Sequence, residues 1–438
     1  MVEECSDGAE QQVARDLEQQ VGRQRGGDGR YIGLEVPKHA EDVGQREAAV
    51  DPGHQRPDDR PVVQPAVITP ETAFQLSEGQ AALWFLHRLA PQSAAYNVVG
   101  AATLRGEVDP TTLRRAFQAL IDRHPVLRSR FETFGGEPAQ IIQENVTLFF
   151  HEEDSSALSD ADFSNRIAEE ARRPFDLENG PVIRLALFTR NGGDRLLVLV
   201  AHHIVIDMWS VAVLVKELKS IYEAVASGGI PTLSAPEFSY GDFVAWQQAE
   251  LAGPHGQQLQ QYWQNELSGE LPVLNLNTDH PRPYLQTYEG ATESIRLEGE
   301  TVNRLQEFAR DNLLPIHSLL LAAYATLLYR YTNQEEVIIG CPTSGRTDRR
   351  FQSLVGYFVN PLPIRIKLSG TMTFRQLIAE VRETVQRAFA HQDYPFPRIV
   401  DDVSPDRDPS RSPLFQTMFA LQNAAAVTFS GIDNCGGG

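Results

Sequence analysis

The pattern of apolar and polar positions predicts a hairpin followed by a helix near the middle of the chain. The apolar-rich runs GPVIRLALFTR (180–190) and DRLLVLVAHHI (194–204) flank an Asn-Gly-Gly sequence, which is typical of a tight turn between strands. The next run, 210–229, has helical spacing of its apolar residues, with Ser210 placed to cap its start. Strand, loop and helix therefore meet at residues 201–210.

The same patterns predict a mixture of strands and helices before this region. Residues 94–106 predict a strand, and residues 83–91 have the character of the end of an amphipathic helix. A further helix is predicted over 111–127, because its apolar residues share one face. The residues on that face are Leu113, Phe117 and Leu120.

A second unit of similar composition is predicted to begin near residue 270. Its expected strands are 291–299, 335–342, 362–368 and 414–422, and its expected helices are 301–312 and 316–332. Helical segments between residues 238 and 267 are expected to join the two units. Mixed antiparallel strands and helices in both units predict an α+β fold, with a substrate site in the cleft between them.

The first 68 residues differ from the rest. They are rich in Gln, Arg, Asp, Glu and Gly and poor in aromatic residues, so they cannot bury enough apolar surface to offset the entropy of ordering. We therefore expect a disordered or weakly helical extension at 1–68, followed by domains at 69–250 and 251–438.

Composition narrows the function classes. The net charge of -19 argues against binding to nucleic acid or to an anionic membrane surface. The three cysteines are far apart and form no CxxC pair, so neither a zinc site nor a disulfide framework is predicted. No secretion signal and no membrane-spanning apolar run is evident, and we expect a cytoplasmic protein.

The stretch AHHIVIDMWS (201–210) carries the candidate chemistry. Side chains alternate along a strand, so His202 and His203 are expected to point to opposite faces and to have different roles. A histidine titrates near neutral pH and can act as a general base, and Asp207 could orient it or pair with an arginine. The alternative is that both histidines only end a strand and bond to backbone groups. A site for a single metal ion is disfavoured, because side chains on opposite faces of a strand cannot both reach one ion.

Seven stretches in one order resemble the motifs of the condensation domains of nonribosomal peptide synthetases. The stretches are LSEGQAALWFLHRLAP (76–91), RHPVLRSRF (123–131), HHIVIDMWS (202–210), FSYGDFVAWQ (238–247), VGYFVNPLPIR (355–365), HQDYPF (391–396) and RDPSRSPLFQ (407–416). The third is similar to the family's HHxxxDG signature. The resemblance covers about residues 70–425.

The resemblance implies a fold and a reaction. Members of the family have two chloramphenicol-acetyltransferase-like subdomains that form a V with a central tunnel. Phosphopantetheine arms of an upstream and a downstream peptidyl carrier domain enter the tunnel, and the downstream amine attacks the upstream thioester to form an amide. The implied partners are these carriers and an adjacent adenylation domain, and no cofactor is bound directly. A tunnel suits this chemistry because it brings tethered reactants together and excludes water.

The resemblance also implies roles for individual residues. His203 corresponds to the histidine in the tunnel, where it positions the amine or accepts its proton, and His202 is a packing residue. Asp207 is implied to form a structural ion pair with Arg128. The signature's glycine is replaced here by Met208, which requires an ordinary backbone or strain and could narrow the tunnel.

Three more residues are candidates to line the tunnel. They are Asn360, Arg346 and Trp209. The alternatives are that Asn360 is chosen for turn geometry and that Arg346 is solvated. Three aromatic residues of the motifs are expected in the core, namely Trp84, Tyr394 and Phe396, and Asp408 and Arg411 are expected to pair across a turn.

Alternatives of different kinds remain. An epimerisation domain shares the fold and the histidine motif, whereas a heterocyclisation domain is disfavoured because His202 is not an aspartate. A recruitment module without catalysis is expected to have a degraded histidine motif. The chain stops after LFQTMFALQNAAAVTFSGIDNCGGG, before the closing strands and helix of the family, so an inactive fragment or an interrupted reading frame is also expected.

Overall fold

The computed structural model describes residues 73–104, 108–231, 233–284, 286–297, 299–403, 408–422 and, for the backbone alone, 432–434. The extension predicted at 1–68 lies outside the described residues. Within the described ranges the chain is a mixture of helices and open sheets, as the α+β prediction requires. Taken one at a time, none of the helices in these ranges has both the length and the apolar character needed to cross a membrane.

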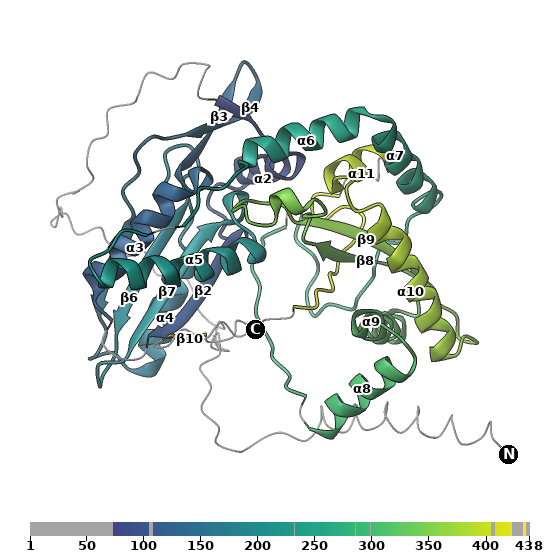
Figure 1. Cartoon of the computed structure of the whole chain (residues 1–438). Helices are drawn as coiled ribbons and strands as arrows, with labels where there is room; N and C mark the ends of the chain where they lie inside the picture. Colours follow the sequence, from purple (N-terminus) through teal and green to yellow (C-terminus); the bar gives the residue numbers. More distant parts are fainter. Residues whose placement is uncertain are drawn as a thin grey trace, which may run out of the picture. The chain divides into compact units, whose positions relative to one another are not determined.

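The first part of the chain builds a five-stranded sheet in the order β10-β2-β7-β6-β5 (Figure 1). Its elements, with those that pack around it, are β1 (Ala73–Gln75), α2 (Glu78–Leu89), β2 (Asn97–Leu104), α3 (Pro110–Arg123), η2 (Pro125–Arg128), β3 (Ser129–Phe134), β4 (Glu137–Ile142), β5 (Phe149–Asp154), α4 (Asp160–Arg172), β6 (Ile183–Thr189), β7 (Arg195–His202), η3 (His203–Val205) and α5 (Met208–Ala226). The short strand β10 (Ile432–Asn434) pairs with β2 at the edge of this sheet.

The predicted hairpin is confirmed as β6 and β7, which pair antiparallel from Ile183 opposite Ala201 to Thr189 opposite Arg195. Positive φ angles at Gly192 and Gly193 form its turn, a conformation that glycine adopts without strain. On its other side β7 pairs antiparallel with β2, so the strand that leads to the histidines is central. Both neighbours fix the backbone up to His202.

Strands β1, β4 and β3 form a separate three-stranded sheet, and the remaining elements build a two-stranded sheet with helices on it. These elements are α6 (Tyr240–Ala252), α7 (Pro254–Glu266), α8 (Glu300–Asp311), α9 (Ile316–Thr332), β8 (Glu336–Thr343), η4 (Arg349–Phe351), β9 (Asn360–Lys367), α10 (Phe374–Ala390) and α11 (Phe396–Val403). Strands β8 and β9 pair antiparallel, and α9 and α10 pack together beside them (Figure 1). The predicted helices at 301–312 and 316–332 are confirmed.

Two predicted strands of this part are wrong. The described residues of 291–299 form no strand, and their apolar side chains Ile295 and Leu297 are exposed, so alternation alone did not pair them with a neighbour. Residues 414–422 make only one parallel bridge, Met418 to Gly340. Two backbone hydrogen bonds hold that bridge, from Gly340 to Thr417 at 3.0 Å and from Phe419 to Gly340 at 2.8 Å.

The buried apolar residues form two cores. The first core runs from Leu76 to Val244 and the second from Leu259 to Phe415, with the helices α6 and α7 passing from one to the other. Four residues of the later sequence, Phe351, Leu354, Val355 and Phe358, nevertheless belong to the first core. We call residues 345–358 the return segment, because it brings the later chain back to the first sheet. The domain boundary at 250/251 stays a prediction.

The aromatic residues expected in the core are buried to different degrees. Trp84 lies in the first core and Tyr394 in the second, each 4% exposed, and both predictions are confirmed. Phe396 is partly buried against the second core. Asp408 and Arg411 form the predicted pair across a turn, with 2.6 Å between Oδ2 and Nε.

The start of the return segment requires a glycine. Gly345 has a φ angle of +62°, and a Cβ at this position would lie 1.8 Å from the carbonyl oxygen of Phe358. We expect Gly345→Ala to lower the free energy of unfolding by at least about 1 kcal/mol, because alanine is strained at positive φ and the close backbone must also move. Urea unfolding measures the change. Gly290→Ala is the control, because nothing lies within 4 Å of that Cβ; equal losses in both variants would contradict the prediction.

Candidate functional site

The candidate site is the corner between β7 and α5, residues 202–210, which we call the histidine corner. The strand ends at His202, a single turn of 3-10 helix covers His203 to Val205, and α5 begins at Met208. Asp207 is the N-cap, since its Oδ1 accepts a hydrogen bond of 2.6 Å from the backbone N–H of Ser210. The prediction that Ser210 caps this helix is therefore wrong, because the extended backbone before the helix is that of Asp207.

The imidazole of His203 is fixed by its Nδ1. This atom lies 2.7 Å from the carbonyl oxygen of Ile206, and because a carbonyl only accepts, Nδ1 carries the hydrogen. The backbone N–H of His203 donates to the carbonyl of Tyr96 at 2.8 Å. Within the described residues Nε2 has no hydrogen-bond partner. The free ring nitrogen is therefore an acceptor when the imidazole is neutral.

Burial keeps this imidazole neutral. It lowers the pKa of His203 below its ordinary value, while the hydrogen bond to Ile206 and the charge of Asp207 act in the opposite direction. Burial is the largest of these effects. At neutral pH the side chain therefore offers an unprotonated Nε2, which is the state that a general base or an amine-positioning group needs.

His202 has a different environment. Its Nδ1 accepts a hydrogen bond of 3.1 Å from the backbone N–H of Ile204, so its hydrogen lies on Nε2. Burial lowers its pKa to about 3, with smaller contributions from His87 and His203. The ring packs among His87, Tyr96 and Phe175. These contacts support a packing role for His202.

The expected ion pair between Asp207 and Arg128 is not formed. Asp207 pairs instead with Arg346, whose Nη2 lies 3.2 Å from Oδ1 and 3.3 Å from Oδ2, and both side chains are 1% exposed. Arg128 is the last residue of η2, and its guanidinium donates to the backbone carbonyls of Ile121, Gln143 and Glu144. The N–H donors of Arg128 therefore bond to backbone carbonyls close to it.

Arg346 belongs to a buried polar cluster that the sequence did not indicate. Its Nη1 donates to the carbonyls of Phe351 and Leu354 at 2.6 and 2.8 Å, and its guanidinium lies 3.8 Å from the ring centroid of Phe358. Ser210 Oγ accepts from Arg346 at 2.8 Å and bonds to both backbone groups of Gly356. The cluster ties the return segment to the histidine corner, and the alternative of a solvated Arg346 is wrong.

Two further buried polar residues support the corner and were missed. Gln80, near the start of α2, donates from Nε2 to the carbonyl of Ile204 at 3.0 Å. The hydroxyl of Tyr240, at the start of α6, bonds to Ser77 Oγ at 2.9 Å and donates to the carbonyl of Tyr357 at 2.5 Å. Gln80 and Tyr240 lie within the motif-like runs 76–91 and 238–247, and this position is the sequence feature that could have indicated them.

The other candidate residues are placed as follows. Met208 is the first residue of α5, 53% exposed, and its backbone is ordinary, so no strain follows from the missing glycine. Trp209 is 45% exposed and donates from Nε1 to the carbonyl of Gln352 at 2.8 Å. Asn360 donates to the carbonyls of Gln392 and Tyr394 and accepts from the N–H of Phe396. Its amide positions the 392–396 loop; its place on a tunnel floor stays a prediction.

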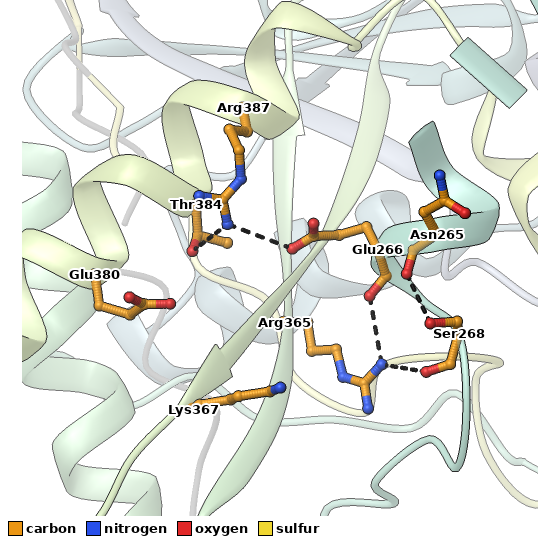
Figure 2. Close-up of a pocket in the computed structure, with 8 residues that line it drawn as sticks. All are labelled: Asn265, Glu266, Ser268, Arg365, Lys367, Glu380, Thr384 and Arg387. Carbon is orange, nitrogen blue, oxygen red and sulfur yellow. Dashed lines mark hydrogen bonds and ion pairs between the residues drawn. The ribbon is translucent and has the colours of Figure 1, made fainter. Parts of the chain in front are cut away.

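A polar pocket of about 320 Å³ lies elsewhere, around the end of α7 (Figure 2). Arg365 donates there to the carbonyls of Glu266, Ser268 and Glu270 and pairs with Glu336. Its guanidinium therefore satisfies carbonyl groups at a helix end, which otherwise lack partners. The residues that line this pocket include none from the histidine corner or the return segment.

We expect Arg346→Ala to lower the free energy of unfolding by about 3–5 kcal/mol, because it leaves the buried Asp207 carboxylate without its cation. Arg350→Ala, in the same segment, is the matched control, since its partner Asp348 lies beside it on the surface. Urea unfolding measures both. Adding Asp207→Asn to Arg346→Ala should recover part of the loss. Similar losses for the two arginines would refute this account of the corner.

The two histidines are expected to have opposite neutral tautomers. A long-range ¹H–¹⁵N spectrum of the folded domain at neutral pH should show the hydrogen of His203 on Nδ1 and that of His202 on Nε2. Single His→Gln variants assign the signals. On acidification His203 should titrate below 6.5 and before His202, whose pKa is about 3. Finding the same tautomer at both positions would contradict the hydrogen bonds described above.

Comparison with known proteins shows the family. The condensation domain model matches residues 71–431. A linear gramicidin synthase of Brevibacillus parabrevis is 41% identical over 365 residues, which are 82% of this chain and 5% of that relative. The chain therefore spans only a small part of this relative.

Solved structures agree on the fold. A four-domain nonribosomal peptide synthetase bound to AMP and glycine aligns with a TM-score of 0.75 and 24% identity, over 84% of this chain and 28% of that one. The X-domain from teicoplanin biosynthesis aligns with a TM-score of 0.72 and 27% identity, over 81% and 78%. Structures of this family have the two chloramphenicol-acetyltransferase-like subdomains predicted from the sequence. The chain belongs to the condensation domain family.

Proposed function

We propose that this chain forms an amide bond between two carrier-bound substrates, as the condensation domain of a nonribosomal peptide synthetase. The observation that carries the proposal is the fixed, neutral imidazole of His203, whose Nε2 has no hydrogen-bond partner among the described residues. Family membership, with an intact pair of histidines, supports the reaction class. Two phosphopantetheine-bearing carrier domains are the proposed partners, together with an adjacent adenylation domain.

The proposed chemistry is an aminolysis of a thioester. The lone pair of the downstream α-amine attacks the carbonyl carbon of the upstream acyl or peptidyl thioester, which forms the C–N bond and a tetrahedral intermediate. The C–S bond then breaks, and the thiolate leaves on the upstream carrier arm. The nitrogen loses one proton, which His203 Nε2 accepts and passes to the thiolate. Atoms and charge balance without a further reactant.

His203 acts chiefly by positioning the amine in this proposal. An α-amino group has a pKa of about 7.7–8.0, so part of it is already unprotonated near neutral pH. An acceptor at Nε2 holds the N–H of the attacking amine and directs its lone pair, which lowers the entropic part of the barrier. Asp207 and Arg346 support His203 by fixing the corner. Met208 and Trp209, both exposed beside it, are the proposed contacts for a carrier-bound substrate.

Recruitment without catalysis is the second candidate, because the X-domain aligns over most of its length, and one X-domain has been solved in complex with OxyB. The intact histidines favour condensation over this role. Epimerisation is disfavoured by the runs LSEGQAALWFL and GYFVNPLPIR.

The decisive experiment uses donor and acceptor carriers loaded with substrates. We expect His203→Ala to lower the rate of amide formation by about 100-fold or more, because the amine loses its hydrogen-bond acceptor. His255→Ala is the control, since this histidine is exposed and pairs with Glu250. Mass spectrometry of the upstream and downstream carriers measures the product. An undiminished amount of product from the His203 variant would contradict the proposed mechanism. If neither the parent chain nor any variant forms product, recruitment without catalysis is favoured.

A further inference from the structure

Tyr357 is the side chain of the return segment that reaches His203. The two ring centroids are 5.0 Å apart, and the planes meet at 82°, which is the edge-to-face geometry preferred by aromatic pairs. The imidazole is thus held at Nδ1 by the Ile206 carbonyl and across its ring by Tyr357. One of these contacts is local in sequence, and the other comes from more than 150 residues away.

A glycine makes room for this ring. Gly79, in the first turn of α2, approaches Tyr357 so closely that a Cβ on it would lie 2.7 Å from Cε1 and 3.1 Å from Cδ1. Such distances are shorter than carbon atoms can approach without displacement. The Tyr357 ring therefore lies between the backbone of α2 and the imidazole, and any side chain at position 79 would shift it.

The backbone of Tyr357 is also held firmly. Its carbonyl accepts the hydroxyl of Tyr240 at 2.5 Å. The neighbours on each side, Gly356 and Phe358, bond to Ser210 and Asp207 of the histidine corner. The backbone that carries the Tyr357 ring is thus fixed, and the backbone of α2 lies behind the ring. The contact between this ring and His203 therefore has little freedom.

We propose that Tyr357 is a positioning residue for the condensation reaction: its ring holds the His203 imidazole in the orientation that leaves Nε2 open to the acceptor amine. The inference rests on the proposed function, and it assigns to the return segment a direct effect on the reacting group. The contact is made by the ring, so phenylalanine can replace tyrosine and alanine cannot.

The ring also keeps water from one side of the imidazole. Within the part of the chain that the structure describes, the titratable groups that contact or act on His203 are Asp207 at the start of α5, the adjacent His202, Tyr96 before β2, and Tyr357 itself. Asp207 raises the pKa of His203, whereas burial, the larger effect, lowers it. Removing the ring reduces the burial, so the pKa of His203 rises towards its ordinary value.

The test compares Tyr357→Phe, Tyr357→Ala and Gly79→Ala in the full chain with loaded carriers. We expect Tyr357→Phe to keep kcat within about twofold of the parent. Tyr357→Ala and Gly79→Ala should each lower kcat about 10- to 100-fold with little change in KM for either carrier, because the acceptor nitrogen is misplaced rather than the carriers unbound. Urea unfolding confirms that each variant is folded.

Gly241→Ala is a matched control for Gly79→Ala. Each glycine is the second residue of a helix that begins with a capping box, but a Cβ on Gly241 meets only ordinary contacts, the nearest at 3.5 Å. It should leave kcat unchanged. Gly79→Ala in the Tyr357→Ala background should cause no further loss, because no ring remains to be displaced. Additive losses, or a loss in Tyr357→Phe equal to that in Tyr357→Ala, would overturn the proposal.

An NMR titration separates this inference from the proposed function. The pKa of His203 should be higher in Tyr357→Ala than in the parent and unchanged in Tyr357→Phe, whether or not the chain condenses substrates. If the titration moves as expected but His203→Ala keeps full activity, the proposed function's mechanism fails and the contact stands. If the titration does not move, the positioning role of Tyr357 fails.

Discussion

The buried ion pair between Asp207 and Arg346 is the interaction on which the histidine corner depends. Taking two charges from water is costly, and the cost is offset only where geometry and further hydrogen bonds are good. Here Asp207 also accepts from the N–H groups of Ser210 and Phe358, and Arg346 also donates to two carbonyls and to Ser210. Asp207 and Arg346 therefore stabilise the histidine corner only when the return segment is in place. The pair makes the start of α5 and the return segment one structural unit.

Two residues of the same type acquire opposite roles from their hydrogen bonds. His202 accepts at Nδ1 from a backbone N–H, and His203 donates from Nδ1 to a backbone carbonyl. The first arrangement uses the lone pair of Nδ1 for structure, and the second leaves the lone pair of Nε2 without a partner among the described residues. Burial makes both imidazoles neutral at physiological pH. The chemistry at this corner is thus set by which backbone group each ring meets, one residue apart.

Sequence patterns correctly predicted those structural features that depend on residues close to one another in the chain. The hairpin of β6 and β7 and the buried face of α3 follow from local periodicity, and both are confirmed. Alternation also suggested a strand at 291–299, but a strand needs a partner, and none of its described residues pairs. The family resemblance implied Arg128 as the partner of Asp207, whereas the actual partner, Arg346, is 139 positions away. Spacing carries no information about a contact that only the return segment creates.

The surroundings of His203 show why neither part of the chain can build this site alone. The imidazole is held by the Ile206 carbonyl, and the backbone N–H of His203 by the Tyr96 carbonyl, both from the first part. Tyr357 from the return segment packs on the imidazole and lies close to Gly79. A chain cut near residue 250 would leave Asp207 as an unpaired buried charge and the first core without Phe351, Leu354, Val355 and Phe358. Its α5 would lose the cation that balances its capping carboxylate, and His203 would lose one wall. The His203 imidazole therefore lies in the first part, and one of the contacts that surround it comes from the return segment.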